Sequence, residues 1–274
     1  MKKLLSSIFL MALSIAGNGQ SLSTFNALEL GLLKPKESIQ LGLGTMNGRM
    51  QFGVGLQVSD KNSVHYSLTH RNSLQGYDFF IVSGNSKVNS TTHQLSFAHT
   101  DIKNDGKNGL EWQAAVSHAA FNYEERITSI LGIASEEPLG VITETVEYEQ
   151  ITFSAAVLWH RYKNKRDAYV GLRTNHSYYP TMKINIFSDE IRYKSSGYKL
   201  PTIGSVAGIN WQKGLFKVGC QVGVQFGESL QLDVDESYEF HGEIVSETSH
   251  VYYTSSHAYV ALQLGYLLNS RLNK

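Results

Sequence analysis

The feature that most constrains the fold of this chain is a strand-like alternation in which neither face resembles the charged, water-facing side of a soluble sheet. In residues 50–58 (MQFGVGLQV) every even-numbered side chain is large and apolar, and every odd-numbered one is Gly or Gln. Successive side chains of a β-strand point to opposite faces, so one face is hydrocarbon and the other is small and uncharged. The alternation recurs in residues 39–44, 168–173, 216–226 and 259–266.

These strand-like segments contain very little charge. Across them and residues 202–211, only Arg173 and Lys217 are charged, whereas charged residues make up 18% of the chain. A water-exposed face would need more charge for solubility, but a narrow polar lumen would not. We therefore expect the apolar faces to contact lipid and the polar faces to line the inside of a barrel. The residues expected to contact lipid include Val54, Leu172, Val222 and Leu262.

The N-terminal residues 1–19 are expected to be a cleaved signal peptide. Lys2 and Lys3 precede an uncharged, mostly apolar run of 14 residues, which is too short to span a bilayer comfortably as a helix. Small residues follow, and we expect cleavage near Gly19 or Gln20. The mature chain, residues 20–274, is expected to be a single domain. It contains no apolar run of 18 residues, so it is expected to enter a membrane only as strands.

The connections between the predicted strands are of two kinds. Short turns are expected at residues 47–49, 104–109, 163–167 and 212–214, and long polar loops at about 122–149, 177–200 and 227–255. Trp112, Trp159 and Trp211 each lie near one of the short turns. Short turns at one rim, long loops at the other and aromatic residues at the membrane interfaces are typical of transmembrane β-barrels.

On these patterns the mature chain resembles bacterial outer-membrane β-barrel proteins. The resemblance implies an all-β, antiparallel, up-and-down barrel in the outer membrane of a bacterium with two membranes, with long extracellular loops and periplasmic short turns. We expect about 12 strands, with 10 as the alternative. The predicted strands are 26–33, 38–46, 50–58, 63–70, 76–83, 92–102, 109–121, 149–161, 167–176, 202–211, 214–226 and 256–268.

The polar faces supply the residues that a lumen would present. The candidates are Glu111, Gln113, Arg173, Lys217, Gln221, Gln225 and Gln263. Opposite charges in a lumen can pair into a plug or line a conduit for a small solute. A packed polar core is an equally good interpretation for a barrel this narrow.

The last predicted loop is strongly acidic. Residues 227–255 contain seven Asp or Glu and no Lys or Arg. A solvated loop is one interpretation, and an extracellular rim that attracts cations or a basic partner is the other. The candidate residues are Asp233, Asp235, Glu236, Glu239 and Glu243. Their spacing matches no calcium-loop motif, so we predict no metal site.

An enzymatic function receives little support from the sequence. His65 and Ser67 resemble the His-x-Ser pair of outer-membrane phospholipases and lipid A deacylases, but Leu68 stands where those enzymes have Asn. Both side chains are also expected to point inward, away from lipid. No phosphate loop, zinc-spaced cysteines or dinucleotide fingerprint occurs, so no cofactor is expected. Lys and Arg total 24, as do Asp and Glu, which argues against nucleic acid as a partner.

Three functions remain open at the level of sequence. The first is a non-enzymatic outer-membrane barrel, acting as a small channel or as a scaffold or assembly component of the envelope. Its expected partners are outer-membrane lipid, other envelope proteins and a small solute. The second is a lipid hydrolase built on the same barrel, and the third is a secreted soluble β-sandwich or adhesin.

Overall fold

The chain forms β-strands joined by turns. The computed structural model describes residues 38–46, 49–79, 82–103, 107–130, 142–163, 166–186, 193–195, 198–240, 243–254 and 256–269. None of these residues belongs to a helix that could cross a bilayer. The strands are β1 (Ser38–Met46), β2 (Arg49–Gln57), β3 (Asn62–Phe79), β4 (Val82–Ile102), β5 (Asn108–Ile130), β6 (Ile142–Lys163), β7 (Arg166–Ile186), β8 (Tyr193–Ser195), β9 (Tyr198–Lys213), β10 (Phe216–Gly227), β11 (Ser229–Phe240), β12 (Glu243–Thr254) and β13 (His257–Asn269).

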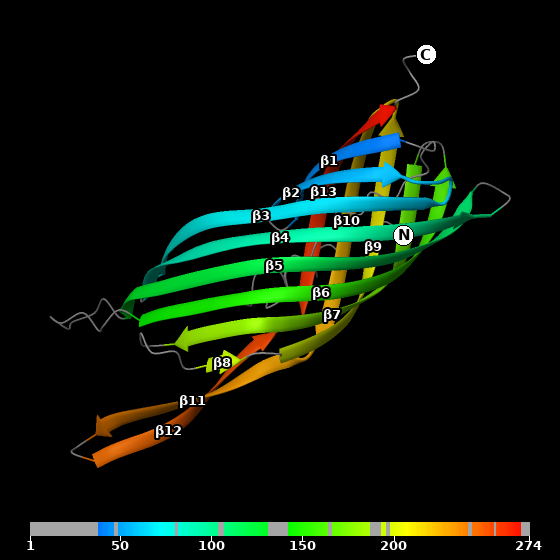
Figure 1. Cartoon of the computed structure of the whole chain (residues 1–274). Helices are drawn as coiled ribbons and strands as arrows, with labels where there is room; N and C mark the ends of the chain where they lie inside the picture. The colour runs from blue at the N-terminus through cyan, green and yellow to red at the C-terminus, as the bar shows by residue number, and fades with distance from the viewer. Residues whose placement is uncertain are drawn as a thin grey trace, which may run out of the picture.

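Ten of these strands close into one antiparallel barrel (Figure 1). The order around the ring is β1, β2, β3, β4, β5, β6, β7, β9, β10 and β13, and β13 pairs back onto β1. Strands that are neighbours in the ring also follow one another along the chain. The short β8 and the pair β11–β12 lie outside the ring and interrupt this order only in the numbering. The predicted all-β, up-and-down transmembrane barrel is confirmed.

The barrel has ten strands, so the main prediction of twelve is wrong and the alternative is right. Ten of the predicted ranges each correspond to one strand of the ring. The range 76–83 does not form a strand of its own, because β3 and β4 pair continuously as far as Phe79 and Val82. It therefore contributes the end of β3 and the start of β4. The remaining range, 26–33, lies outside the described residues.

Strands β4 to β7 are much longer than a membrane span requires. They contain 21, 23, 22 and 21 residues, whereas a tilted span needs about 9–11. Pairing of β5 with β6 continues to Ile127 and Ile142. Much of the predicted loops 122–149 and 177–200 is therefore strand. Their outward side chains, such as Glu147 and Lys183, are polar because this face meets water above the bilayer, whereas inward side chains such as Val146 and Ile184 are buried.

The predicted acidic loop contains a hairpin. Strands β11 and β12 pair with each other in a separate two-stranded sheet, which extends away from the barrel (Figure 1). This hairpin lies between β10 and β13, which are themselves paired neighbours in the ring. The backbone of the chain thus continues the β10–β13 hairpin beyond the barrel wall.

The chain reverses direction at two rims. At the short-turn rim β2 passes to β3, β4 to β5, β6 to β7 and β9 to β10, and β1 begins and β13 ends there. The β9–β10 turn includes Gly214, whose φ of 60° favours glycine. At the extended rim β3 passes to β4, β5 to β6, β7 to β9 and β10 to β11. The short β1–β2 turn also lies at the extended rim, contrary to the predicted sorting, because these two strands have only nine residues each and stop below their neighbours.

The outer wall of the barrel carries an apolar band. The alternation predicted in residues 50–58 is confirmed: the even-numbered side chains are exposed, and Gln51 and Gln57 are buried. Val54 is 47% exposed and Leu172 is 62% exposed, values that make sense only when lipid covers this surface. All three tryptophans are exposed on the outer wall near the short-turn rim.

Aromatic residues toward the extended rim lie on both faces of the barrel wall. Tyr178 is exposed, but Tyr148 and Tyr179 are buried. These two occupy the inward positions of β6 and β7, so they do not belong to an outer aromatic belt.

Candidate functional site in the barrel interior

The inner face of the barrel is polar and buried. The seven residues predicted to line a lumen are all inward-facing, and their exposed fractions lie between 1% and 7%: Glu111, Gln113, Arg173, Lys217, Gln221, Gln225 and Gln263. Among the described residues, the buried carboxylates are those of Glu111 and Asp167, and Arg173 and Lys217 are equally buried. The formal charges of these four side chains cancel.

A charged cluster centred on His160 lies near the short-turn rim. The ring of His160 places Nδ1 2.8 Å from Asp167 Oδ1 and Nε2 3.6 Å from Glu111 Oε2. Two neutral groups complete the cluster: the Thr100 hydroxyl donates to Glu111 (3.0 Å), and the Asn210 amide donates to Asp167 (3.3 Å). The cluster therefore joins the inner faces of β4, β5, β6, β7 and β9.

His160 and Asp167 were not among the predicted site residues. The signal that identifies them is their position in the alternation. Asp167 shares the odd-numbered, inward face of β7 with Arg173, although the sequence placed it in a turn. His160 shares the even-numbered, inward face of β6 with Leu158.

A chain of amide and guanidinium hydrogen bonds extends from this cluster along the wall. The Gln113 amide donates to Glu111, and Arg173 Nη2 donates to Gln113 Oε1 at 3.4 Å. This chain links β5 to β7 across the intervening β6. Arg173 on β7 and Glu111 on β5 are thus coupled through one glutamine.

Two tyrosines and one glutamine form a bridge inside the barrel. The Tyr169 hydroxyl donates to Gln221 Oε1, and Gln221 Nε2 donates to the Tyr259 hydroxyl, both at 3.1 Å. These residues come from β7, β10 and β13. We call them the Tyr–Gln–Tyr bridge. Strand β9 lies between β7 and β10, and β10 and β13 are neighbours, so the bridge runs along the inner wall over four consecutive strands of the ring.

Two glycines make room for the bridge. Tyr169 pairs directly with Gly208, and Tyr259 pairs directly with Gly223. A Cβ added at Gly208 would lie 2.3 Å from the Tyr169 ring, and one at Gly223 would lie 2.4 Å from the Tyr259 ring. Each aromatic ring therefore lies flat over the backbone of its partner strand, which only glycine allows.

Apolar side chains fill the space around the bridge. Met46 from β1, Leu158 from β6 and Val206 from β9 belong to one buried cluster with Tyr169 and Tyr259. Strands β1 and β6 stand on opposite sides of the ring, and the other members of the cluster come from β7, β9 and β13 between them, so the cluster extends over half of the inner wall. At this level the interior is occupied by side chains of the barrel itself.

A second polar network lies on the extended-rim side of the bridge. Asn175 Nδ2 donates to Thr202 Oγ1 (3.1 Å) and to Gln225 Oε1 (3.2 Å). The Gln150 amide donates to the hydroxyls of Ser177 (2.9 Å) and Tyr179 (3.0 Å). The remaining predicted lumen residue, Gln263 on β13, is buried on the inner face.

A closed ring with an apolar outer band, tryptophans at one edge of that band and a buried polar interior is the arrangement by which strands cross a lipid bilayer. The chain therefore has the fold of a transmembrane β-barrel. No ring strand has a free edge along its transmembrane part, which is what the absence of water in the bilayer demands.

Comparisons with known proteins locate no close relative of this barrel. No family model matches the sequence, and no curated protein matches it. Among solved structures, the outer-membrane protease OmpT of Escherichia coli has 8% identity and a TM-score of 0.47, over 84% of this chain and 93% of that one. The translocator domain of the autotransporter NalP of Neisseria meningitidis has 13% identity and a TM-score of 0.42, over 84% and 86%.

A third solved structure, the toluene transporter TodX of Pseudomonas putida, has 8% identity and a TM-score of 0.31, over 86% of this chain and 91% of that one. The three named activities are a protease, a translocator and a transporter. At identities and TM-scores this low, none of these similarities bears on the function of this barrel.

The His65–Ser67 pair lies inside the barrel. Both side chains are buried on the inner face of β3, as the alternation predicts. His65 Nε2 is 2.9 Å from the hydroxyl of Ser63, two residues before it on the same face. Within the part of the chain that the structure describes, no group of three or more His, Cys, Asp or Glu side chains is placed to hold a metal ion.

The five acidic candidates lie on the hairpin outside the barrel. Asp233, Asp235, Glu236 and Glu239 are on β11 and Glu243 is the first residue of β12. The register places Glu236 directly opposite Glu247. The side chains of the hairpin lie outside the described part of the structure.

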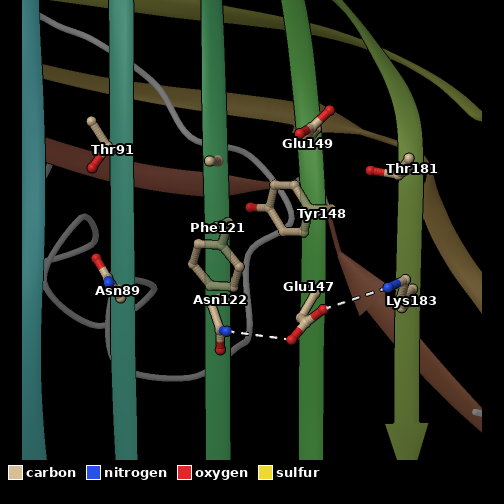
Figure 2. Close-up of a pocket in the computed structure, with 10 residues that line it drawn as sticks. Asn89, Thr91, Phe121, Asn122, Glu147, Tyr148, Glu149, Thr181 and Lys183 are labelled. Carbon is tan, nitrogen blue, oxygen red and sulfur yellow. Dashed lines mark hydrogen bonds and ion pairs between the residues drawn. The ribbon is translucent and has the colours of Figure 1, made fainter.

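A polar groove occupies the outer wall of the barrel toward the extended rim. Its volume is about 480 Å³, and Figure 2 shows its lining on β4 to β7. Asn122 donates to Glu147 (3.4 Å), and Glu147 lies 4.0 Å from the Lys183 ammonium. These three side chains interact with one another and are exposed to solvent, so none of them needs a ligand as a partner.

Proposed function

We propose that this protein is an integral scaffold of the outer membrane in a bacterium with two membranes, rather than an open channel or an enzyme. It would reach that membrane through a cleaved signal peptide at residues 1–19. Lipid would cover the apolar band, and other envelope proteins would be its partners outside the bilayer. The observation that carries this proposal is the burial of the inward side chains, Tyr169, Tyr259 and the seven predicted lumen residues included, because an open lumen would leave them accessible to water.

The polar interior supports the same conclusion. A conduit needs charged or polar side chains that face water, whereas Glu111, Asp167 and Arg173 are buried and engaged with neighbours on the wall. Buried polar groups that bond to each other stabilise a unique core. A core of this kind is better suited to holding a rigid barrel together than to passing a solute.

The parts of the barrel above the bilayer supply the surface that a scaffold needs. Strands β4 to β7 continue well past the apolar band, and the β11–β12 hairpin extends farther still. The acidic residues along this hairpin would favour a partner with a basic surface.

A hydrolase on the same barrel is less well supported. A lipid-cleaving serine must be reached by lipid, but Ser67 and His65 are buried on the inner face. A nucleophile also needs a base held by a third group. His65 Nε2 contacts the hydroxyl of Ser63, which is not an acid.

Conductance across a planar lipid bilayer tests the proposal. The wild-type barrel should insert without opening steady ion-conducting steps. The double variant Tyr169→Ala/Tyr259→Ala, which removes both ends of the bridge, should conduct. Tyr178→Ala is the matched control, because Tyr178 lies on the outer wall of β7, and it should remain silent. Steady conductance of the wild-type protein, equal to that of the double variant, would make it a channel.

A further inference from the structure

Two arginines face each other on the inner wall at the extended rim. Met50 on β2 pairs with His70 on β3. In the same register the next residues toward the rim, Arg49 and Arg71, stand opposite each other on the inward face. Each is partly exposed to solvent, so a solute that enters from this rim can reach them.

Neither arginine has a carboxylate partner among the described residues. Arg71 Nε donates to the hydroxyl of Ser73 (3.2 Å). Arg49 Nε is buried and has no hydrogen-bond partner in the described part of the chain. The electrostatic neighbours of Arg49 are Tyr148 and Arg71. Like charges directly opposite each other on paired strands repel. A bound anion would therefore stabilise these two guanidinium groups.

A buried hydroxyl completes this site from the other side of the barrel. Tyr148 on β6 is 3% exposed, and its hydroxyl has no hydrogen-bond partner. Its ring is fixed by stacking on Phe121 (centroids 4.7 Å apart) and by an edge contact with Tyr179 (5.4 Å). Tyr148 therefore offers a rigidly held donor close to the Arg49 guanidinium. A buried polar group without a partner is costly unless a ligand satisfies it.

We propose that Arg49, Arg71 and Tyr148 form a binding site for an oxyanion carried by a small soluble molecule, a phosphate or a carboxylate. Arginine binds both groups through two parallel N–H donors, and a phenol adds a third. The site faces the interior of the barrel, so its ligand comes from solution and not from a lipid headgroup. Gln51 donates to Thr69 just below the two arginines (3.3 Å), and both side chains are buried, so the packed core lies directly beneath the site.

Thermal unfolding of the full-length protein in non-ionic detergent, with sodium phosphate as the probe, tests this site. Phosphate replaces sodium chloride at constant ionic strength. A ligand that binds only the folded state raises the melting temperature saturably, and we expect this for the wild type. Arg49→Gln and Arg71→Gln should each abolish the rise. Without phosphate, both variants should melt no lower than the wild type, because each removes the repulsion between the guanidinium groups.

Two further variants make the result decisive. Arg126→Gln is the matched control, because Arg126 is exposed and paired with Glu124 (2.7 Å); it should keep the full phosphate effect. Arg71→Lys keeps the charge but loses the two-donor geometry, and should bind phosphate about tenfold more weakly.

Succinate in place of phosphate separates a carboxylate site from a phosphate site. An equal rise with chloride alone, or a rise that persists in Arg49→Gln/Arg71→Gln, would overturn the site. The site exists whether or not the lumen conducts, so this titration and the conductance measurement can fail separately.

Discussion

At the scale of the residue, the barrel interior explains why glycine alternates with larger polar side chains on the inner face. Tyr169 and Tyr259 each lie over a glycine on the paired strand, and both bond to Gln221. The glycines supply no contacts of their own. Because glycine has no Cβ, the two rings can lie where their hydroxyls bond to Gln221. The small residues of the pattern therefore position the large ones.

Replacing Gly223 with Ala should destabilise the barrel for this reason. The new methyl group would overlap the Tyr259 ring and displace its hydroxyl from Gln221, an overpacking effect of about 1–3 kcal/mol. Urea unfolding in detergent micelles measures the change. In a Tyr259→Ala background the same substitution should cost almost nothing, because the ring is absent. An equal cost in both backgrounds would mean that the strand, not the ring, rejects the methyl group.

At the scale of the element, each long strand has a lipid-facing part and a part beyond the bilayer. On β7 the outward residues change from Val170 and Leu172 to Thr181 and Lys183 toward the extended rim. Backbone pairing with β6 continues through both parts. The hydrogen-bond ladder therefore does not mark the membrane boundary, but the outward side chains do.

Substituting arginine at two positions of β7 should separate these parts. Leu172→Arg places a charge in the apolar band and should cost about 2–4 kcal/mol of folding free energy. Thr181→Arg, on the same strand beyond the band, should be nearly neutral. Denaturant titration of the protein folded into lipid vesicles gives both values. If Leu172→Arg were as mild as Thr181→Arg, lipid would not cover this face.

At the scale of the whole molecule, both ends of the described barrel lie at the short-turn rim, and the long strands and the β11–β12 hairpin lie at the other. Outer-membrane barrels place short turns in the periplasm and long connections outside. The extended rim, with its acidic hairpin and its arginine pair, is therefore expected to face the exterior.

Epitope tags on intact cells test this orientation. A tag inserted at Gly242, between β11 and β12, should be reached by antibody. A tag at Asn164, between β6 and β7, should be reached only after the outer membrane is permeabilised. Detection of the Asn164 tag alone on intact cells would mean that the barrel has the opposite orientation, with the hairpin in the periplasm.

The sequence by itself determined where the apolar part of each of the ten ring strands lies and which way the side chains of that part point. The reason is that the two-residue period is a local property of the backbone, so Val54 and Gln51 were assigned to opposite faces without knowledge of any partner strand. The seven inward candidates, from Glu111 to Gln263, follow from the same rule. Only the tertiary structure decided the number of strands, because beyond the bilayer the outward face is polar and apolar side chains such as Val146 and Ile184 point inward, so the lipid-facing pattern is absent there. It also decided which inward groups meet. Tyr169 and Gln221 are 52 residues apart. The pairing of β7 with β9 and of β9 with β10 brings them together, and the pairing of β5 with β6 brings Glu111 to His160. Both depend on pairing between strands that are distant in the sequence.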